Sequence, residues 1–245
     1  MPQGSARAFI LGSSPINEQD KFIYLLSQEK GLLKAIAPGS LKVKNRFGSL
    51  FELFTKGEFF YYYKEDKEII TISKGEIIKS YFNIVSNPEN IFYFYLISEI
   101  LLKSLAPNQQ DKRVFKLMES ILNNRVEGVE INFLLLYFLI WILRIEGMMF
   151  NPSICYNCFL KDINRAWVKN NFRGVLCEKC KNNEKFTINQ EELNYIKWTE
   201  INPPKNSNIW KNKIDINKMI KLFVKKIESH TECTLNSSRY ITELK

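Results

Sequence analysis

The chain is poor in the side chains that most enzymes need. Its 245 residues include a single histidine, His230, so neither Cys233 nor any serine has an evident partner base. There is no glycine-rich GxxxxGK[ST] string for a nucleotide and no HxE motif of a zinc deaminase. The acidic residues are scattered rather than paired as in a two-metal nuclease. These absences predict that the protein is not an enzyme.

Long apolar runs are also absent. The longest, Phe133–Leu143, is preceded by Asn132 and followed by Arg144. A membrane-spanning helix needs about 20 apolar residues. A shorter helix that is apolar on all sides is typical of the buried centre of a helical bundle. The first residues lack the apolar stretch of a secretory signal, so we expect a protein that works in the cytoplasm, away from membranes.

Basic residues outnumber acidic ones. Lys and Arg total 35 against 26 Asp and Glu, giving a formal charge of +9. This excess indicates a polyanionic partner. Frequent lysine can also reflect the base composition of a genome, so the positions of the charges are more informative than their number.

Four of the five cysteines form two CxxC pairs, and the remaining one, Cys233, has no partner at such a spacing. The 18 residues between the pairs match the spacing of zinc ribbons and knuckles. Four thiolate ligands leave no position for a catalytic water, which predicts one closed, structural Zn²⁺ site. An iron–sulfur cluster is the main alternative, and disulfides or a redox pair are less consistent with the sequence. The predicted ligands are Cys155, Cys158, Cys177 and Cys180.

The N-terminal part predicts short strands separated by glycine and proline turns. One helical interruption fits Gln19–Gln28, where apolar residues recur ahead of Gly31. Five or six strands in so short a stretch favour a small closed barrel. The expected strands are Arg7–Leu11, Leu32–Ala37, Phe51–Phe54, Glu58–Tyr63 and Ile69–Ile72.

From Asn87 onward the apolar spacing becomes helical. The expected fold class is therefore α+β: a barrel in residues 1–82, then a helical domain in 83–245 with a zinc module at 153–182. The expected helices are Ile91–Leu105, Asp111–Leu122, the buried run 131–145, Gln190–Lys197 and Ile216–Glu228.

Cations crowd around the connection from Pro38 to Gly48, which contains no acidic residue. The alternation in Leu-Lys-Val-Lys predicts an extended segment with Lys42, Lys44 and Arg46 on one face. Together with Lys34 they are candidate phosphate contacts on a single-strand-binding barrel. The alternative is a solvated hairpin tip without a function. The nearby aromatic run, residues 59–63, must contribute alternate rings to the core and is assigned no base contact.

Motifs along nearly the whole chain, in the right order, resemble the bacterial recombination mediator family RecO. The strongest lie in the first 55 residues and at the cysteines. They are Ala6–Leu11, Glu18–Asp20, Leu25-Leu26, Glu29–Gly31, Ala37–Gly39, Gly48–Thr55, both CxxC pairs, His230 and the ending Leu235–Arg239.

This resemblance implies an N-terminal five-stranded OB-fold and a helical domain with an inserted zinc knuckle of four cysteine ligands. It implies binding of single- and double-stranded DNA, annealing of complementary strands and action with RecR. It also implies docking of the C-terminal tail of single-strand DNA-binding protein and loading of RecA at the bacterial nucleoid, without a bound nucleotide.

The family's Arg/Lys-rich stretch after the barrel glycine corresponds to residues after Gly39. Lys42, Lys44 and Arg46 match it, and Arg7 and Lys34 complete the predicted DNA-binding set. The chain departs from the family pattern where Ser40 and Leu41 replace cations and Leu53 replaces a common proline, which predicts weaker DNA affinity or a different loop course. A zinc-containing adaptor whose barrel docks a partner protein, with incidental DNA affinity, is the alternative function.

Overall fold

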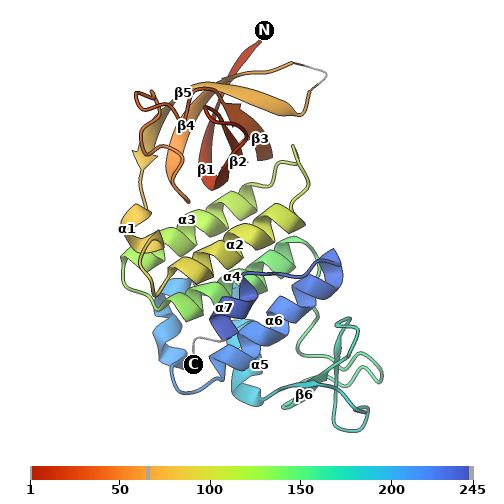
Figure 1. Cartoon of the computed structure of the whole chain (residues 1–245). Helices are drawn as coiled ribbons and strands as arrows, with labels where there is room; N and C mark the ends of the chain where they lie inside the picture. The colour runs from red at the N-terminus through yellow and green to blue at the C-terminus, as the bar shows by residue number, and fades with distance from the viewer. Residues whose placement is uncertain (1, 65–66, 243–245) are drawn as a thin grey trace. The chain divides into compact units, whose positions relative to one another are not determined.

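The computed structural model describes residues 2–64 and 67–242 (Figure 1). The chain forms two compact units, Met1–Glu119 and Ser120–Lys245. The first contains the barrel and the helices packed on it, and the second contains the cysteines.

The first unit is built around a closed five-stranded barrel with the strand order β1-β2-β3-β5-β4. Every neighbouring pair is antiparallel except β3 and β5, which are parallel. This arrangement confirms the predicted OB-like barrel. The strands are β1 Gln3–Pro15, β2 Lys21–Ser27, β3 Gly31–Ala37, β4 Lys56–Tyr62 and β5 Ile69–Lys79.

Alternation along the strands separates the barrel core from its surface. On β1, Ala8 and Ile10 point into the core, whereas Arg7 is exposed. Phe9 lies on the opposite face to Ala8 but is also fully buried, because its ring packs 4.8 Å from that of Phe115. β1 is therefore covered on both faces near its middle.

Helices of the first unit supply that outer cover. They are α1 Phe82–Val85, α2 Ile91–Ser104 and the beginning of α3 Lys112–Val126. The Ser98 hydroxyl donates a hydrogen bond to the Leu11 carbonyl, and the Lys56 ammonium pairs with Glu119 at 2.5 Å. These contacts group α2 with the barrel, and a domain boundary at residue 82 stays a prediction.

The helix predicted at Gln19–Gln28 is wrong, because this segment contains strand β2. Its apolar residues mimic a helical period, but Ile23 and Leu25 enter the barrel core and Leu26 is buried on the other face. Backbone pairing with β1 on one side and β3 on the other replaces the local helical hydrogen bonds. Tertiary pairing has overridden a weak local preference.

The strand predicted at Phe51–Phe54 is also wrong. The chain from residue 38 to 55 follows a series of turns, and Phe54 adopts the left-handed φ of 58°. Phe47, Leu50 and Phe51 insert into the barrel core instead of pairing with a strand. The segment is buried because it covers the barrel, not because it belongs to the sheet.

The second unit is organised around α4, Ile131–Ile145, of which 11 residues are buried. This confirms the predicted core helix, and within the described residues no helix is both long and apolar enough to cross a membrane. The predicted helices on either side of the zinc segment are confirmed as well. Around α4 lie α5 Gln190–Ile201, the 3₁₀ helix η1 Pro204–Trp210, α6 Ile216–Thr231 and α7 Ser238–Thr242.

Polar contacts fix α5 against its neighbours. Asn189 and Glu192 form a capping box at its start. Glu192 is fully buried, and the Lys218 ammonium neutralises it at 2.5 Å. Arg144 of α4 donates hydrogen bonds to the Ile196 carbonyl and to the Thr199 hydroxyl. The order of the helices therefore depends on paired charges as well as on apolar packing.

A small antiparallel sheet with the order β7-β6-β8 follows the first cysteine pair and was not predicted from the sequence. Its strands are β6 Ala166–Val168, β7 Val175–Leu176 and β8 Phe186–Ile188. Strands of two or three residues are too short for their alternation to be recognised in a sequence. This sheet places the two cysteine turns next to each other.

Candidate metal centre and nucleic-acid interface

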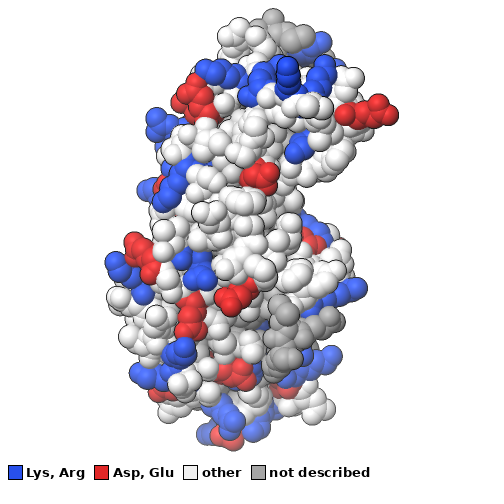
Figure 2. All heavy atoms as spheres, turned by 60° about the vertical axis from the view of Figure 1, so that its left-hand side comes forward, with Lys and Arg blue, Asp and Glu red and all other residues white. Residues whose placement is uncertain are grey.

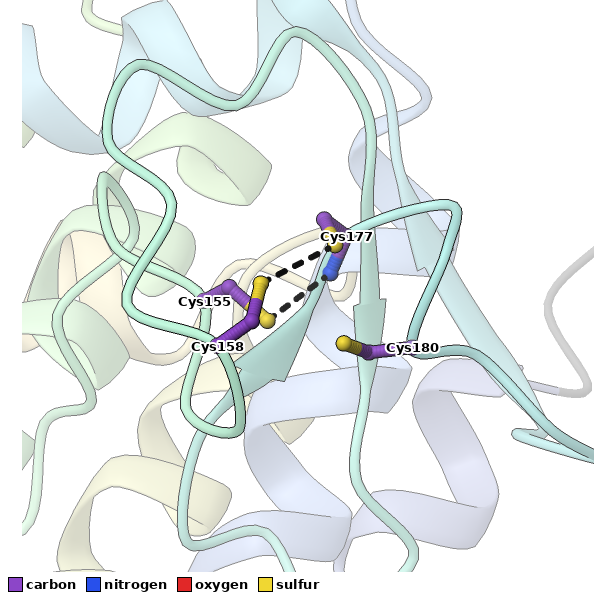
Figure 3. Close-up of side chains that lie close together, drawn as sticks. All are labelled: Cys155, Cys158, Cys177 and Cys180. Carbon is purple, nitrogen blue, oxygen red and sulfur yellow. Dashed lines mark hydrogen bonds between the residues drawn. The ribbon is translucent and has the colours of Figure 1, made fainter.

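The four CxxC cysteines converge on one point. Cys155 and Cys158 come from a turn before β6, and Cys177 and Cys180 come from the turn that follows β7 (Figure 3). All four sulfur atoms lie within 4.8 Å of one another, and the sulfurs of Cys158 and Cys177 are 3.6 Å apart. Residues separated by up to 25 positions in the sequence thus form a single cluster.

Matching backbone hydrogen bonds shape the two turns. The Phe159 amide donates to the Cys155 carbonyl at 3.0 Å, and the Lys181 amide donates to the Cys177 carbonyl at 3.1 Å. The Tyr156 amide, in the first turn, donates to the Val175 carbonyl of β7 at 2.7 Å. Each turn directs its two sulfurs to the same side, and the Tyr156 bond joins the turns.

The surroundings of the sulfurs favour thiolate at Cys155. Burial alone would raise the pKa of this thiol, but backbone amides of Cys158, Cys177 and Asn157 donate to the sulfur and lower its pKa to about 6. The Cys177 amide lies 3.3 Å from the Cys155 sulfur. Amide donors stabilise a negative sulfur in the way found at metal–thiolate sites.

The cluster passes a simple test of fit for a metal ion. Tetrahedral ligation at a Zn–S distance of about 2.3 Å places sulfurs about 3.8 Å apart. The Cys158–Cys177 separation of 3.6 Å is close to that value, and no two of the four sulfurs are more than 4.8 Å apart. The four cysteines could therefore hold a metal ion, whereas Cys233 is exposed and outside the cluster.

Aromatic side chains pack around the cysteine cluster. A Cβ atom at Gly174 would lie 2.6 Å from the Tyr156 ring, so glycine permits this close packing. The Lys169 ammonium lies 4.1 Å from the centre of the same ring, and the Lys181 ammonium lies 4.3 Å from that of Trp167. These cation–π contacts keep basic groups near the cysteine turns.

The basic loop, residues 38–48, carries a group of exposed cations on the barrel. Lys42, Lys44 and Arg46 are all exposed. Asn45 supports them, because its side-chain oxygen accepts hydrogen bonds from the amides of Phe47 and Gly48. The loop is a series of turns, so the predicted extended segment with three cations on one face is wrong. Its exposure and its rigid base remain suited to a polyanion.

The other two predicted DNA-binding residues lie on the barrel wall. Lys34 is half-buried on β3 and pairs in register with Tyr24 of β2. Arg7 is exposed on β1 and stands opposite Glu58 of β4. Figure 2 shows basic side chains gathered on the barrel in the upper part of the view. Within the described residues the loop brings three predicted cations together, while Lys34 and Arg7 stand on separate strands.

An acidic residue at the base of the loop could not be found from its sequence neighbours. The Asp20 carboxylate accepts a hydrogen bond from the Gly39 amide at 2.7 Å. This bond, then one from Asn17, lowers the pKa of Asp20, and the charge of Lys42 lowers it further. Asp20 thus fixes the turn from which the cations project.

His230 is exposed in the last turn of α6. This position suits a capping or surface role. Positive groups there interact favourably with the helix dipole.

Comparisons with known proteins agree with this architecture. The family model for the recombination protein O N terminal matches residues 1–81, and the one for the recombination protein O C terminal matches residues 85–239. The chain is 27% identical to the DNA repair protein RecO of Clostridium novyi over 78% of this chain and 75% of that protein.

Other relatives give similar values. Identity to the DNA repair protein RecO of Clostridium acetobutylicum is 24% over 78% of each chain. Identity to that of Mesoplasma florum is 23% over 80% of this chain and 74% of the relative. With both family models matched in order, the chain belongs to the RecO family of DNA repair and recombination proteins.

Proposed function

We propose that this protein is a non-enzymatic recombination mediator that binds single- and double-stranded DNA and anneals complementary strands. The observation that carries the proposal is the basic loop, whose exposed cations project from a closed five-stranded barrel. Barrels of this type bind single strands in a basic groove that follows the phosphates.

In this mechanism Lys42, Lys44 and Arg46 neutralise phosphates, and Lys34 and Arg7 extend the contact along the barrel wall. Two complementary strands repel each other through their phosphates. A protein that binds both strands reduces this repulsion and raises their local concentration, so base pairing proceeds without a nucleotide. No bond is made or broken by the protein.

The proposed cofactor is one structural Zn²⁺ held by Cys155, Cys158, Cys177 and Cys180. Sulfur ligands alone suit zinc or an iron–sulfur cluster, and the spacing of the two pairs favours zinc. A bound ion would brace the two cysteine turns and the small sheet between them. It supplies folding free energy and no catalytic step.

The proposed partners come from the family. They are RecR, the C-terminal tail of single-strand DNA-binding protein and, indirectly, RecA, with the bacterial cytoplasm and nucleoid as the place of action. The domain division proposed for these tasks is 1–82 for the barrel and 83–245 for the helical part with the zinc module.

Annealing tests this proposal directly. Two complementary, fluorescently labelled oligonucleotides are mixed with the purified protein across a salt series, without nucleotide. We expect acceleration that falls steeply as salt rises, because each phosphate contact releases counterions. If a folded, metal-loaded protein gave no acceleration at any salt concentration, a partner-binding adaptor would be the better account.

A further inference from the structure

The second unit contains a lysine-rimmed groove whose floor is aromatic. Its volume is about 540 Å³. Phe172 and Phe186 line it, and their ring centres are 6.2 Å apart. The described lining includes no acidic side chain, and the lysines that surround the rings are Lys169, Lys185, Lys221 and Lys225. We name this feature the Phe172 groove.

The rim cations come from three separate segments. Lys169 follows β6, Lys185 precedes β8, and Lys221 and Lys225 are one helical turn apart on α6. Lys225 pairs with Glu228 at 2.6 Å, and Lys169 lies over the Tyr156 ring. Within residues 2–64 and 67–242, Lys185 and Lys221 form no ion pair. The groove therefore retains unneutralised positive charge on two separate segments of its lining, the residue before β8 and helix α6.

Phe172 occupies a backbone position that suits glycine or asparagine. Its φ is 55°, and its amide closes a turn by donating to the Lys169 carbonyl at 2.7 Å. Left-handed backbone is rare for a bulky side chain and adds strain. Phe54 and Phe159 share this conformation, so it marks a tight turn, and the separate observation is that the turn places the Phe172 ring in the lining of the groove.

A buried lysine holds this turn in place. Lys226 is only 6% exposed, and its ammonium donates to the Phe172 carbonyl at 2.6 Å. Burying an ammonium costs free energy unless it is hydrogen-bonded. The contact holds the Phe172 backbone, while the ring lines the groove.

We propose that the Phe172 groove is a second nucleic-acid site, which binds a single strand by stacking a base on Phe172 and Phe186 while the rim lysines contact the flanking phosphates. Every base has a flat face that can stack on an aromatic ring, so such a site is tolerant of sequence. Cations contributed by three separate segments around the rings suit a strand with several phosphates. An acidic peptide end, with its charge at one point, would need cations from one segment only.

This inference rests on the proposed function and deepens it. A protein that anneals two strands has to hold both, and the barrel loop provides one set of contacts. The Phe172 groove provides a second set of contacts within the second unit. This set differs from that of the basic loop because it includes aromatic rings as well as charges.

The test uses the full-length protein in two backgrounds: the natural chain and a loop variant with Lys42→Ala, Lys44→Ala and Arg46→Ala. Binding of fluorescent oligothymidine is measured against salt in each. In the loop background we expect Phe172→Asn to weaken binding about tenfold with an unchanged salt slope, because stacking releases no counterion. Asparagine tolerates the left-handed backbone, so the turn is retained.

Removing positive charge from the groove should, in contrast, change the salt slope. The pair Lys185→Ala and Lys221→Ala should lower the salt slope by about 1.4 units, from a single-strand slope of about 0.7 per contact. The matched control is Lys205→Ala with Lys213→Ala, two lysines of the same unit that do not line the groove. Its slope should equal that of the loop background. Melting curves and metal content confirm that each variant is folded.

Cross-linking locates the strand. Oligothymidine carrying 5-iodouridine should cross-link under ultraviolet light to Phe172 or Phe186, as mapped by mass spectrometry. If the groove variants bind as the control does and no cross-link appears there, the groove is not a nucleic-acid site. A short acidic peptide that binds the natural chain and is lost on Phe172→Asn, with oligothymidine unaffected, would also overturn the assignment. The proposed function fails on a different result: the loop variant would bind oligothymidine and anneal strands as well as the natural chain does.

Discussion

The two basic surfaces of this protein are supported in different ways. The basic loop displays Lys42, Lys44 and Arg46 at the surface, and two rings, Phe47 in the loop and Phe51 just after it, are buried in the barrel core. The Phe172 groove keeps its rings at the surface and arranges lysines around them. Cations without accessible rings provide charge but no stacking surface, whereas cations around a ring can hold a phosphate while the ring stacks on a base. Similar charge can therefore serve different contacts.

The supports also differ. Apolar side chains inserted into a closed barrel hold the loop, whereas the segment that carries Phe172 lies between the two cysteine pairs. The loop should consequently be insensitive to metal loss, and the groove should depend on it.

The largest effect is expected from Cys177→Ser. Removing one of four ligands should abolish metal binding and destabilise the second unit by several kcal/mol, since a structural metal contributes folding free energy. Measured metal should fall from one ion per chain to near zero, with a lower melting temperature. Cys233→Ser is the matched control, because Cys233 is an exposed cysteine outside the cluster. Equal metal content in the two variants would rule out the four-cysteine site.

A second variant weakens the apolar packing that supports the basic loop. Phe51→Ala removes a ring that is 5% exposed in the barrel core, and such truncations typically cost about 3–5 kcal/mol. We expect a lower free energy of unfolding by denaturant and a weaker, less salt-dependent interaction with DNA. Metal content should be unchanged. Leu41→Ala, which truncates an exposed apolar residue of the same loop, serves as the control and should leave stability nearly unaltered.

The charge of the loop is tested by the variant with Lys42→Ala, Lys44→Ala and Arg46→Ala. Three lost phosphate contacts should reduce the slope of log affinity against log salt by about two units on single-stranded DNA. The comparison is a triple variant that removes the same charge elsewhere, Lys112→Ala, Lys116→Ala and Lys205→Ala. An identical slope for both triple variants would place the phosphate contacts outside the loop.

The smallest effect concerns Lys226. Burial lowers the pKa of its ammonium to about 8 from 10.5. Below pH 8 both folded and unfolded chains hold the proton, and the buried charge costs stability. Between about pH 8 and 10.5 the unfolded chain binds the proton more tightly, so the stability of the natural chain rises relative to Lys226→Met.

We therefore expect Lys226→Met to be more stable than the natural chain near pH 7, and this difference in the free energy of unfolding to decrease as pH rises to about 10. Unfolding by denaturant at each pH measures the difference. Lys225→Met, at the half-exposed neighbouring lysine, is the control. A difference that stays constant over this pH range would contradict a depressed pKa at Lys226.

Much of the architecture could be predicted because its signals are local. The run 131–145 is apolar on every side and becomes the central helix α4 at the predicted bounds. The spacing of the CxxC pairs indicated the cysteine cluster. Each CxxC turn places its own two sulfurs on one side, so a single contact between the two turns brings all four sulfurs together. The predicted five-stranded barrel was likewise confirmed, although one of its strands was not the expected one.

The errors arose where long-range contacts decide the structure. Phe22 to Leu26 has a helical period, but its pairing with β1 and β3 makes it a strand. Phe51–Phe54 has the composition of a strand but forms turns and inserts Phe51 into the barrel core. The aromatic floor of the Phe172 groove could not be predicted, because a phenylalanine in left-handed backbone breaks the rule by which such turns are recognised.

Annealing by matched variants tests the central claim most directly. The rate at which complementary oligonucleotides pair is measured at one low salt concentration for the natural chain, the loop triple variant and Phe172→Asn. The account predicts that both variants anneal more slowly than the natural chain and that combining them slows annealing further. An annealing rate that neither variant changes, with all proteins folded and metal-loaded, would contradict it.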